Sequence, residues 1–235
     1  MSTDRKISLI SIIIPTRNEA DSIGGLLPDL LGIPGVELLV VDGDSTDNTV
    51  DIAKSLGAKV LETSPGRAQQ MNAGAEAAQG GILLFLHSDT HLASGFAEHV
   101  REILKQPGVA AGAFQLSIDG KDFGLRIIEW LVNFRSRVMQ MPYGDQGIFV
   151  TANMFFSVGA FPPQPIMEDF ELIRRLKKRG KVKILHLHAN TSARRWERLG
   201  ILKTTVMNQA IIIGYFLGIS PEKLSGWYRG RYAKG

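Results

Sequence analysis

The chain has 235 residues, enough for one large domain that buries its own apolar core, and it contains no cysteine, which excludes disulfides and thiolate metal sites. Lys and Arg outnumber Asp and Glu by 27 to 23. This mild basic excess suits anionic ligands or a membrane surface, but it is too diffuse for nucleic acid, which we exclude as a partner.

The N-terminal residues 1–6 are polar and show no signal-peptide pattern, so we expect a cytoplasmic protein. The longest apolar stretch, Ala210–Ile219, is interrupted by Gly214 and Gly218. It has about half the length that crosses a bilayer. We therefore expect no membrane-spanning segment.

Short apolar runs rich in β-branched residues alternate with helical patterns in the first part of the chain. The runs predict buried strands at Leu9–Ile14, Leu38–Val41, Ala58–Leu61 and Ile82–Leu86. Apolar residues recurring at helical spacing predict helices around Ile23–Leu31, Val50–Leu56 and Ala68–Ala78. This order predicts right-handed crossovers and an α/β fold, with a mostly parallel, Rossmann-like sheet flanked by helices. Ligands bind such sheets at the carboxyl ends of the strands, so the residues after each strand are candidate site residues.

Polar residues follow the first two predicted strands. Pro15 cannot continue a central ladder, so we expect the first strand to stop there, with Thr16 and Glu19 at the edge of the sheet. Asp42 remains at the tip of the second strand, where its carboxylate can accept a hydrogen bond from a base or a ribose hydroxyl. Each segment alone also fits an ordinary turn with a helix cap.

Candidate phosphate and metal contacts follow the next two strands. Arg67 lies in the first turn of a predicted helix, where the dipole disfavours a cation unless an anion such as a diphosphate occupies the helix mouth. His87, Ser88 and Asp89 follow the fourth strand, and such groups can hold a divalent cation that bridges phosphate oxygens. A simple polar loop is the alternative for these three residues.

Two adjacent acids, Glu168 and Asp169, stand just ahead of an apolar helical pattern. A carboxylate at a helix N-terminus stays ionised in the field of unpaired N–H groups and can accept a proton near neutral pH. The pair equally fits a helix cap. Upstream, Asp145 and Gln146 precede a strand-like run at Ile148–Val150 and fit contacts to a sugar or acceptor, with a turn as the alternative.

Further candidates lie after the acidic pair. His186 and His188 alternate on a strand-like run, Val182–His188, where His188 would be a later metal ligand and a surface histidine is the alternative. Arg195 and Trp196 supply a cation and an aromatic face, which suit stacking on a sugar or gripping a diphosphate. We assign these last two residues to the acceptor.

The C-terminal part combines an apolar helical pattern at Ile201–Leu217 with a stretch of aromatic and basic residues, namely Trp227, Tyr228, Arg229, Arg231, Tyr232 and Lys234. The helix can close the core or pair two subunits into a homodimer. Interleaved aromatic and basic residues also suit peripheral contact with the inner face of a membrane, which a lipid-linked acceptor would make useful. We divide the chain into a domain at 1–198 and a C-terminal segment at 199–235.

Taken together, these motifs resemble the family 2 inverting glycosyltransferases of the GT-A fold, over roughly Ile10–Trp196. The segments that carry the resemblance are Ile12–Glu19, Val40–Asp47, Phe85–Thr90 and Met167–Leu172. Within that family, Gly66–Asn72 and Ser192–Trp196 are similar to a small bacterial subgroup labelled arsenosugar-biosynthesis-type glycosyltransferases.

The resemblance implies an enzyme that moves a sugar from a nucleoside-diphosphate sugar, with a UDP-sugar favoured, to an acceptor hydroxyl with inversion. It implies that Asp169 is the catalytic base and that Glu168 supports it. The acceptor is open, and both a lipid-linked and a small-molecule acceptor fit. The residues that we place against the donor on this ground are Pro15, Thr16, Glu19, Asp42, Arg67 and Ser88.

The resemblance also implies a divalent metal, Mn²⁺ or Mg²⁺. In the Asp-x-Asp motif of the family, the second acid binds this ion, and Asp89 stands at that position. The first acid is replaced by His87, and imidazole is a better ligand for Mn²⁺ than for Mg²⁺.

Two other classes of protein share some of these features. A sugar nucleotidyltransferase would carry a Gly-rich phosphate loop directly after the first strand, and residues 15–19 contain no glycine. A catalytically inactive nucleotide-binding or membrane-docked protein is the second alternative. The joint presence of Asp42, Asp89 and Asp169 argues against it.

Overall fold

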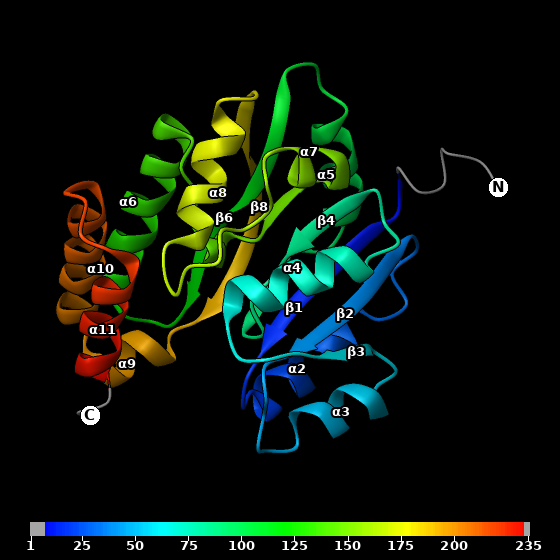
Figure 1. Cartoon of the computed structure of the whole chain (residues 1–235), viewed down its shortest axis with the longest axis horizontal. Coiled ribbons are helices and arrows are strands. Elements are labelled where there is room, and N and C mark those ends of the chain that lie inside the picture. Colours follow the sequence, from blue (N-terminus) through cyan, green and yellow to red (C-terminus); the bar gives the residue numbers. More distant parts are fainter. Residues whose placement is uncertain (1–7, 233–235) are drawn as a thin grey trace.

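An eight-stranded mixed sheet runs through the molecule and separates its helices into layers (Figure 1). The computed structural model describes residues 8–232, apart from the side chains of Arg195 and residues 229–232. In spatial order the strands are β3 (Lys59–Glu62), β2 (Val36–Asp42), β1 (Ile10–Thr16), β4 (Ile82–Phe85), β7 (Ile148–Thr151), β6 (Val109–Asp119), β8 (Lys181–Ser192) and β5 (Thr90–Leu92).

The sheet is parallel from β3 to β4 and mixed beyond it. β7 runs antiparallel to both β4 and β6, β8 pairs parallel with β6, and β5 closes the edge antiparallel to β8. Because β1, β2 and β4 are parallel, their carboxyl ends meet at one edge. The predicted α/β class and GT-A-type sheet are confirmed.

Helices pack on both faces of the sheet. Their bounds are α2 (Ala20–Leu30), α3 (Thr49–Ser55), α4 (Arg67–Ala77), α5 (Phe96–Leu104), α6 (Phe123–Met139), the 3₁₀ turn η1 (Gly144–Gln146), α7 (Ala152–Ser157), α8 (Glu168–Lys177), α9 (Arg194–Leu199), α10 (Ile201–Phe216) and α11 (Pro221–Tyr232). Along β1 the side chains alternate: Ile12 and Ile14 enter the core under α2 and α5, and Ile13 enters the core under α4 and α8.

Gly74 allows α4 to lie directly on β1 and β2. A Cβ atom at this position would overlap the Ile13 side chain and would lie 2.9 Å from Val41 Cγ2. The close approach fixes the start of α4 beside the carboxyl ends of these strands.

Pro15 lies inside β1, so the expectation that the strand stops before it is wrong. The strand continues to Thr16, which pairs with Asp42 of β2. The amide of Leu86 bonds to Ile13 O on the β4 side, and by the alternation of the strand the nitrogen of Pro15 faces that same side. Since β4 ends at Phe85, the missing N–H of the proline costs no ladder bond.

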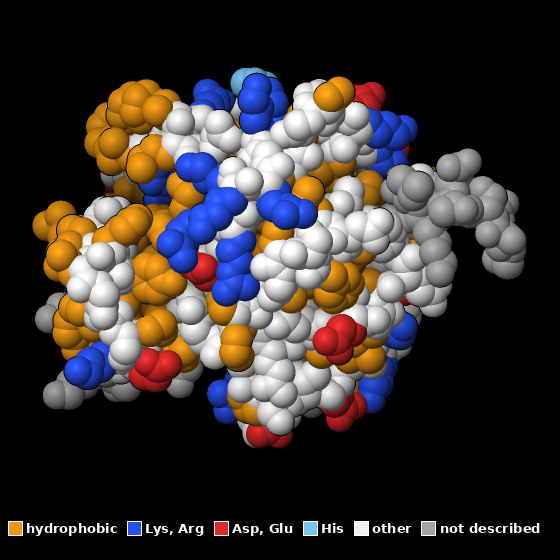
Figure 2. Space-filling view, turned by 45° about the horizontal axis from the view of Figure 1, so that its top comes forward, with side chains coloured by type: hydrophobic (Ala, Val, Ile, Leu, Met, Phe, Trp, Pro, Cys, Tyr) orange, Lys and Arg blue, Asp and Glu red, His pale blue; other side chains and the backbone are white. Residues whose placement is uncertain are grey.

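The C-terminal helices pack on the main body through one face only. Met207 and Ile211 of α10 and Leu224 of α11 belong to the core that also contains α4 and α8. The opposite face carries exposed apolar residues, and Figure 2 shows hydrophobic side chains gathered at the end of the molecule where Figure 1 draws α6, α10 and α11. The proposed boundary at residue 198 falls within α9. No helix within residues 8–232 has the length and apolar character to cross a bilayer.

Candidate active site

A pocket of about 410 Å³ opens where the start of α8 meets the C-terminal helices. Its lining comes from distant parts of the sequence: Arg67, His87 and Asp89 from the first half, Tyr143, Gly144 and Asp145 around η1, Glu168 and Asp169 from α8, Thr191 and Ser192 from the end of β8, Trp196 from α9, and Asn208, Ile211, Ile212, Ser225 and Tyr228 from α10 and α11. The fold thus brings most of the predicted chemistry together.

The predicted acidic pair begins α8, as the sequence indicated. Asp169 Oδ2 accepts a hydrogen bond of 2.6 Å from the Gly144 amide, and Oδ1 accepts one of 2.7 Å from the Phe170 amide. The Asp169 side chain is 13% exposed, towards the pocket that it lines. Two backbone donors therefore hold one carboxylate in a fixed direction at the pocket wall.

Arg67 is paired with the same two acids. Its Nε donates to Glu168 Oε1 at 2.5 Å, and its Nη2 lies 3.9 Å from Asp169 Oδ2. Burial by itself would lower the pKa of Arg67, but the charges of Glu168 and Asp169 outweigh it and raise the pKa above its ordinary value. The sequence suggested that an external anion explains an arginine in the first turn of this helix. In the structure the anionic partner of Arg67 is instead the buried carboxylate of Glu168.

His87 and Asp89 both line the pocket, beside Arg67. His87 Nε2 lies 3.3 Å from Arg67 Nη1. A Cβ atom on Gly144 would sit 3.1 Å from both His87 Nε2 and Asp169 Oδ2, so only a glycine-sized gap separates these two side chains. The His87 imidazole and the Asp169 carboxylate therefore face each other across Gly144 of η1.

A carboxylate and an imidazole are suitable ligands for Mn²⁺, whereas Mg²⁺ prefers oxygen ligands. Among the described residues no three His, Asp or Glu side chains gather into a metal-binding group. His188 is exposed and does not line the pocket with Asp89. Asp89 and His87 thus supply one carboxylate and one imidazole to the pocket wall.

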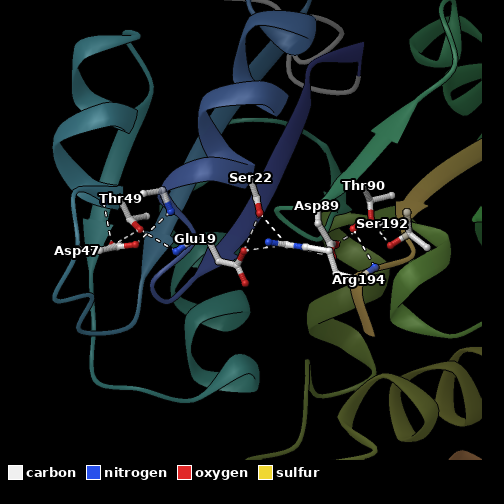
Figure 3. A network of polar contacts seen from close by, with 10 residues as sticks. Glu19, Ser22, Asp47, Thr49, Asp89, Thr90, Ser192 and Arg194 are labelled. Atoms are coloured by element: carbon white, nitrogen blue, oxygen red, sulfur yellow. Dashed lines mark hydrogen bonds and ion pairs between the residues drawn. The ribbon is translucent and has the colours of Figure 1, made fainter. Parts of the chain in front are cut away.

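Arg194 spans the space between the first half of the sheet and Asp89 (Figure 3). Its Nη2 donates to Ser22 Oγ at 2.8 Å and to Glu19 Oε2 at 3.4 Å, and it lies 3.7 Å from Asp89 Oδ2. One guanidinium thus neutralises two predicted site acids at once. The sequence prediction chose its neighbour Arg195, whose side chain lies outside the described residues.

The predicted nucleotide contacts form a separate cluster next to this arginine. Thr16 Oγ1 donates to Asp42 Oδ1 at 3.1 Å, and the amide and hydroxyl of Ser45 donate to the same carboxylate. Gln70, a residue that the prediction did not select, donates to the carbonyls of Thr16 and Val41 and ties β1 to β2. Thr16, Glu19 and Asp42 do not line the 410 Å³ pocket. They lie at the shared carboxyl edge of the strands, as predicted.

Two further predicted residues take structural positions. Ser88 is buried and does not line the pocket. The Gln146 side chain is fully buried, donates to Phe114 O and accepts from Ser136 Oγ and the Tyr143 amide, so it holds η1 in place and does not reach the pocket.

Asp145 and Trp196, the other predicted acceptor contacts, line the pocket. Trp196 is 8% exposed, because most of its ring packs in a small core with Leu116 and Leu125. A ring buried to this degree leaves little free face for stacking on a sugar.

Tyr143 is the main pocket residue that sequence reasoning missed. Arg135 lies 3.6 Å from the centre of its ring. Burial raises the pKa of Tyr143, and Asp169 and Asp145 act in the same direction against the opposing effect of Arg135. The hydroxyl therefore keeps its proton at neutral pH. In the sequence, the position of Tyr143 directly before Gly144 and Asp145 was the signal that could have identified it as a pocket residue.

Curated relatives match part of this chain. A 4,4'-diaponeurosporenoate glycosyltransferase of Staphylococcus haemolyticus is 36% identical over 106 residues, covering 41% of this chain and 28% of the relative. A PGL/p-HBAD biosynthesis glycosyltransferase of Mycobacterium bovis is 39% identical over 93 residues, covering 36% of each. The chain thus spans less than two fifths of the length of these curated relatives.

Solved structures share the fold at low identity. The mannosyltransferase PcManGT from Pyrobaculum calidifontis, in complex with GDP-Man and Mn²⁺, superposes with a TM-score of 0.60 at 19% identity, covering 77% of this chain and 56% of that one. Glucosyl-3-phosphoglycerate synthase from Mycobacterium tuberculosis, in complex with Mg²⁺ and UDP, gives 0.57 at 19% identity and covers 80% and 73%. The family model for glycosyl transferase family 2 matches residues 11–162, well over half of the sequence, and on this match the chain belongs to glycosyl transferase family 2.

Proposed function

We propose that this chain transfers a sugar from a nucleoside-diphosphate sugar to an acceptor hydroxyl with inversion, and that Asp169 is the base. The observation that carries the proposal is the Asp169 carboxylate, held by two backbone N–H groups on the wall of a pocket that also contains Asp89 and Arg67. The acceptor side of the pocket is formed by Tyr143, Asp145 and the C-terminal helices.

The chemistry requires one proton transfer and one displacement. Asp169 takes the proton from the acceptor hydroxyl, the oxygen forms a bond to the anomeric carbon, and the bond to the diphosphate breaks on the opposite side. A single displacement inverts the anomeric centre. Glu168 keeps Arg67 in place beside the base, where its guanidinium can bind the departing diphosphate in the pocket.

The matched structures support the donor class and a metal. PcManGT is in complex with GDP-Man and Mn²⁺, the synthase from Mycobacterium tuberculosis with UDP and Mg²⁺, and a further match, S. aureus TarS, with UDP-GlcNAc. We propose a UDP-sugar as donor, with its nucleotide near Thr16, Glu19 and Asp42. Asp89 and His87 would hold a divalent ion, which when bound neutralises charge on the diphosphate. The arsenosugar-type subgroup stays a prediction about the substrate.

The first test separates donor binding from catalysis. Thermal shift with UDP, GDP and NAD, with and without Mn²⁺, should show metal-dependent stabilisation by a nucleoside diphosphate and none by NAD. A dehydrogenase would instead be stabilised by NAD, and the absence of any nucleoside-diphosphate effect would rule out the proposal.

The second test addresses the base. Asp169→Asn should keep the donor-induced shift and lose about 10²- to 10⁴-fold in turnover of labelled nucleotide sugars. Asp145→Asn is the matched control, because it alters a second carboxylate of the same pocket and should change KM for the acceptor more than kcat. Comparable turnover by the Asp169 variant would show that another group is the base.

A further inference from the structure

Two neighbouring helices expose stripes of large apolar side chains. On α6 the stripe consists of Phe123, Ile127, Trp130, Leu131, Phe134 and Val138, and on α10 it consists of Leu202, Val206 and Ile213, followed by Leu217 directly after the helix. Their exposed fractions run from 47% to 77%. The spacing of three, four and seven residues puts each set on one side of its helix. Continuous apolar faces of this kind normally mark a binding surface.

The two stripes belong to one end of the molecule. The start of α6 packs against the start of α10, since a Cβ atom on Gly124 would lie 3.1 Å from Ile201 Cδ1. Ile128 and Val132 of α6 join Ile201 in packing on the small core around Trp196. Figure 2 shows the resulting concentration of hydrophobic side chains on this side. We call the stripes on α6 and α10 together the docking surface.

We propose that the docking surface binds the face of a bilayer that contains anionic lipid. Residues 121–139 and 194–228 hold nine Lys and Arg against four Asp and Glu, whereas the rest of the chain holds eighteen against nineteen. Two of the nine cations are engaged on the pocket side, Arg194 with Glu19 and Asp89 and Arg135 with the Tyr143 ring, which leaves seven cations against four acids in these segments. Lys121, Arg137 and Lys203 are exposed within these segments. Positive charge beside an exposed apolar stripe complements anionic headgroups over an acyl layer.

The same charge distribution argues against a second copy of the chain as the occupant. A two-fold dimer through this surface would place its positive excess against itself. The acid on α6 that could offset it, Glu129, is mostly buried and accepts a hydrogen bond from the Ile118 amide of the sheet. A bilayer with anionic lipid meets no such repulsion.

The docking surface also lies on the helix that forms one wall of the pocket. Asn208, Ile211 and Ile212 of α10 line the pocket, while Val206 and Ile213 of the same helix are exposed. A membrane-held acceptor could therefore offer its hydroxyl to the pocket without leaving the bilayer. This last step rests on the proposed function, but the binding of the surface to lipid does not.

The test is co-sedimentation of the full chain with vesicles of equal parts phosphatidylglycerol and phosphatidylcholine, against phosphatidylcholine alone. We expect binding to the mixed vesicles, a loss of about tenfold or more in Phe134→Asp, and a weaker preference for anionic vesicles in the double variant Arg137→Glu/Lys203→Glu. Phe156→Asp is the matched control, because Phe156 of α7 is 47% exposed and lies outside the docking surface. It should bind like the unchanged protein.

Three results would overturn the proposal: no binding to mixed vesicles, an equal loss in the Phe134 and Phe156 variants, or sedimentation equilibrium showing a dimer that Phe134→Asp converts to a monomer. Melting temperatures close to that of the unchanged protein would establish that the variants are folded. We expect this result because the substituted side chains are exposed. Hydrolysis of a nucleotide sugar in solution should be unchanged in Phe134→Asp. Failure of the membrane proposal is thereby distinguished from failure of the catalytic one.

Discussion

The pair between Arg67 and Glu168 offers a prediction whose size follows from burial. The Glu168 side chain is 3% exposed and its bond to Arg67 Nε measures 2.5 Å. Replacing Arg67 by Met leaves a buried carboxylate without its cation, a change that costs about 3–5 kcal/mol in buried pairs. Because the Arg67 side chain is 40% exposed, water can partly replace it, and we expect about 3 kcal/mol.

For a chain of this length, about 3 kcal/mol corresponds to a fall in Tm of roughly 6–12 °C. Urea unfolding and calorimetry measure both quantities. Lys54→Met is the matched control: its partner Glu62 is 66% exposed at 3.2 Å, and this pair is expected to contribute less than about 1 kcal/mol.

A second substitution makes the reasoning refutable. Glu168→Gln placed in the Arg67→Met background removes the stranded charge, so it should recover most of the lost stability. If Arg67→Met costs no more than Lys54→Met, or if the double variant is the least stable of the set, then the buried charge is not what Arg67 compensates.

Three further predictions concern the pocket and its supporting helix. Gly144→Ala puts a Cβ atom 3.1 Å from both Asp169 Oδ2 and His87 Nε2, so kcat should fall about tenfold with little change in Tm, and an unchanged kcat would contradict the tight placement. Asp89→Ala should abolish the Mn²⁺-dependent part of the donor-induced thermal shift; if that part persists, the metal lies elsewhere. Burial acts to raise the pKa of Glu171, but hydrogen bonds from two arginines of α8 outweigh it and lower the pKa below its ordinary 4.5. The ionised Glu171 therefore contributes its full stabilisation above about pH 4.5, and this contribution is lost as the pH falls through the lowered pKa of the folded state. The difference in unfolding free energy between the protein and Glu171→Gln should accordingly shrink in acid. A difference that stays constant with pH would refute this prediction.

The early strands and the acidic helix start were predictable because they depend on local pattern. Three apolar runs can be buried on both faces only between two layers of helices, and all three became central strands: Ile12–Ile14, Leu38–Val41 and Ile82–Phe85. Glu168-Asp169 ahead of an apolar helical period gave the start of α8. The region between β5 and η1 gave no comparable signal, and α5, β6 and α6 were missed.

The sequence by itself thus determined the α/β class, the strand tips that carry Thr16, Asp42 and Asp89, and the helix that carries Asp169, since each follows from short-range periodicity and turn chemistry. Tertiary structure alone decided which charges meet: Arg67 with Glu168, and Arg194 with Glu19 and Asp89. These partners are separated by many residues in the sequence, and only the packing of the sheet and its helices brings them together. The same holds for the exposed apolar face of α6, because periodicity shows that a helix has such a face but only packing shows whether anything covers it.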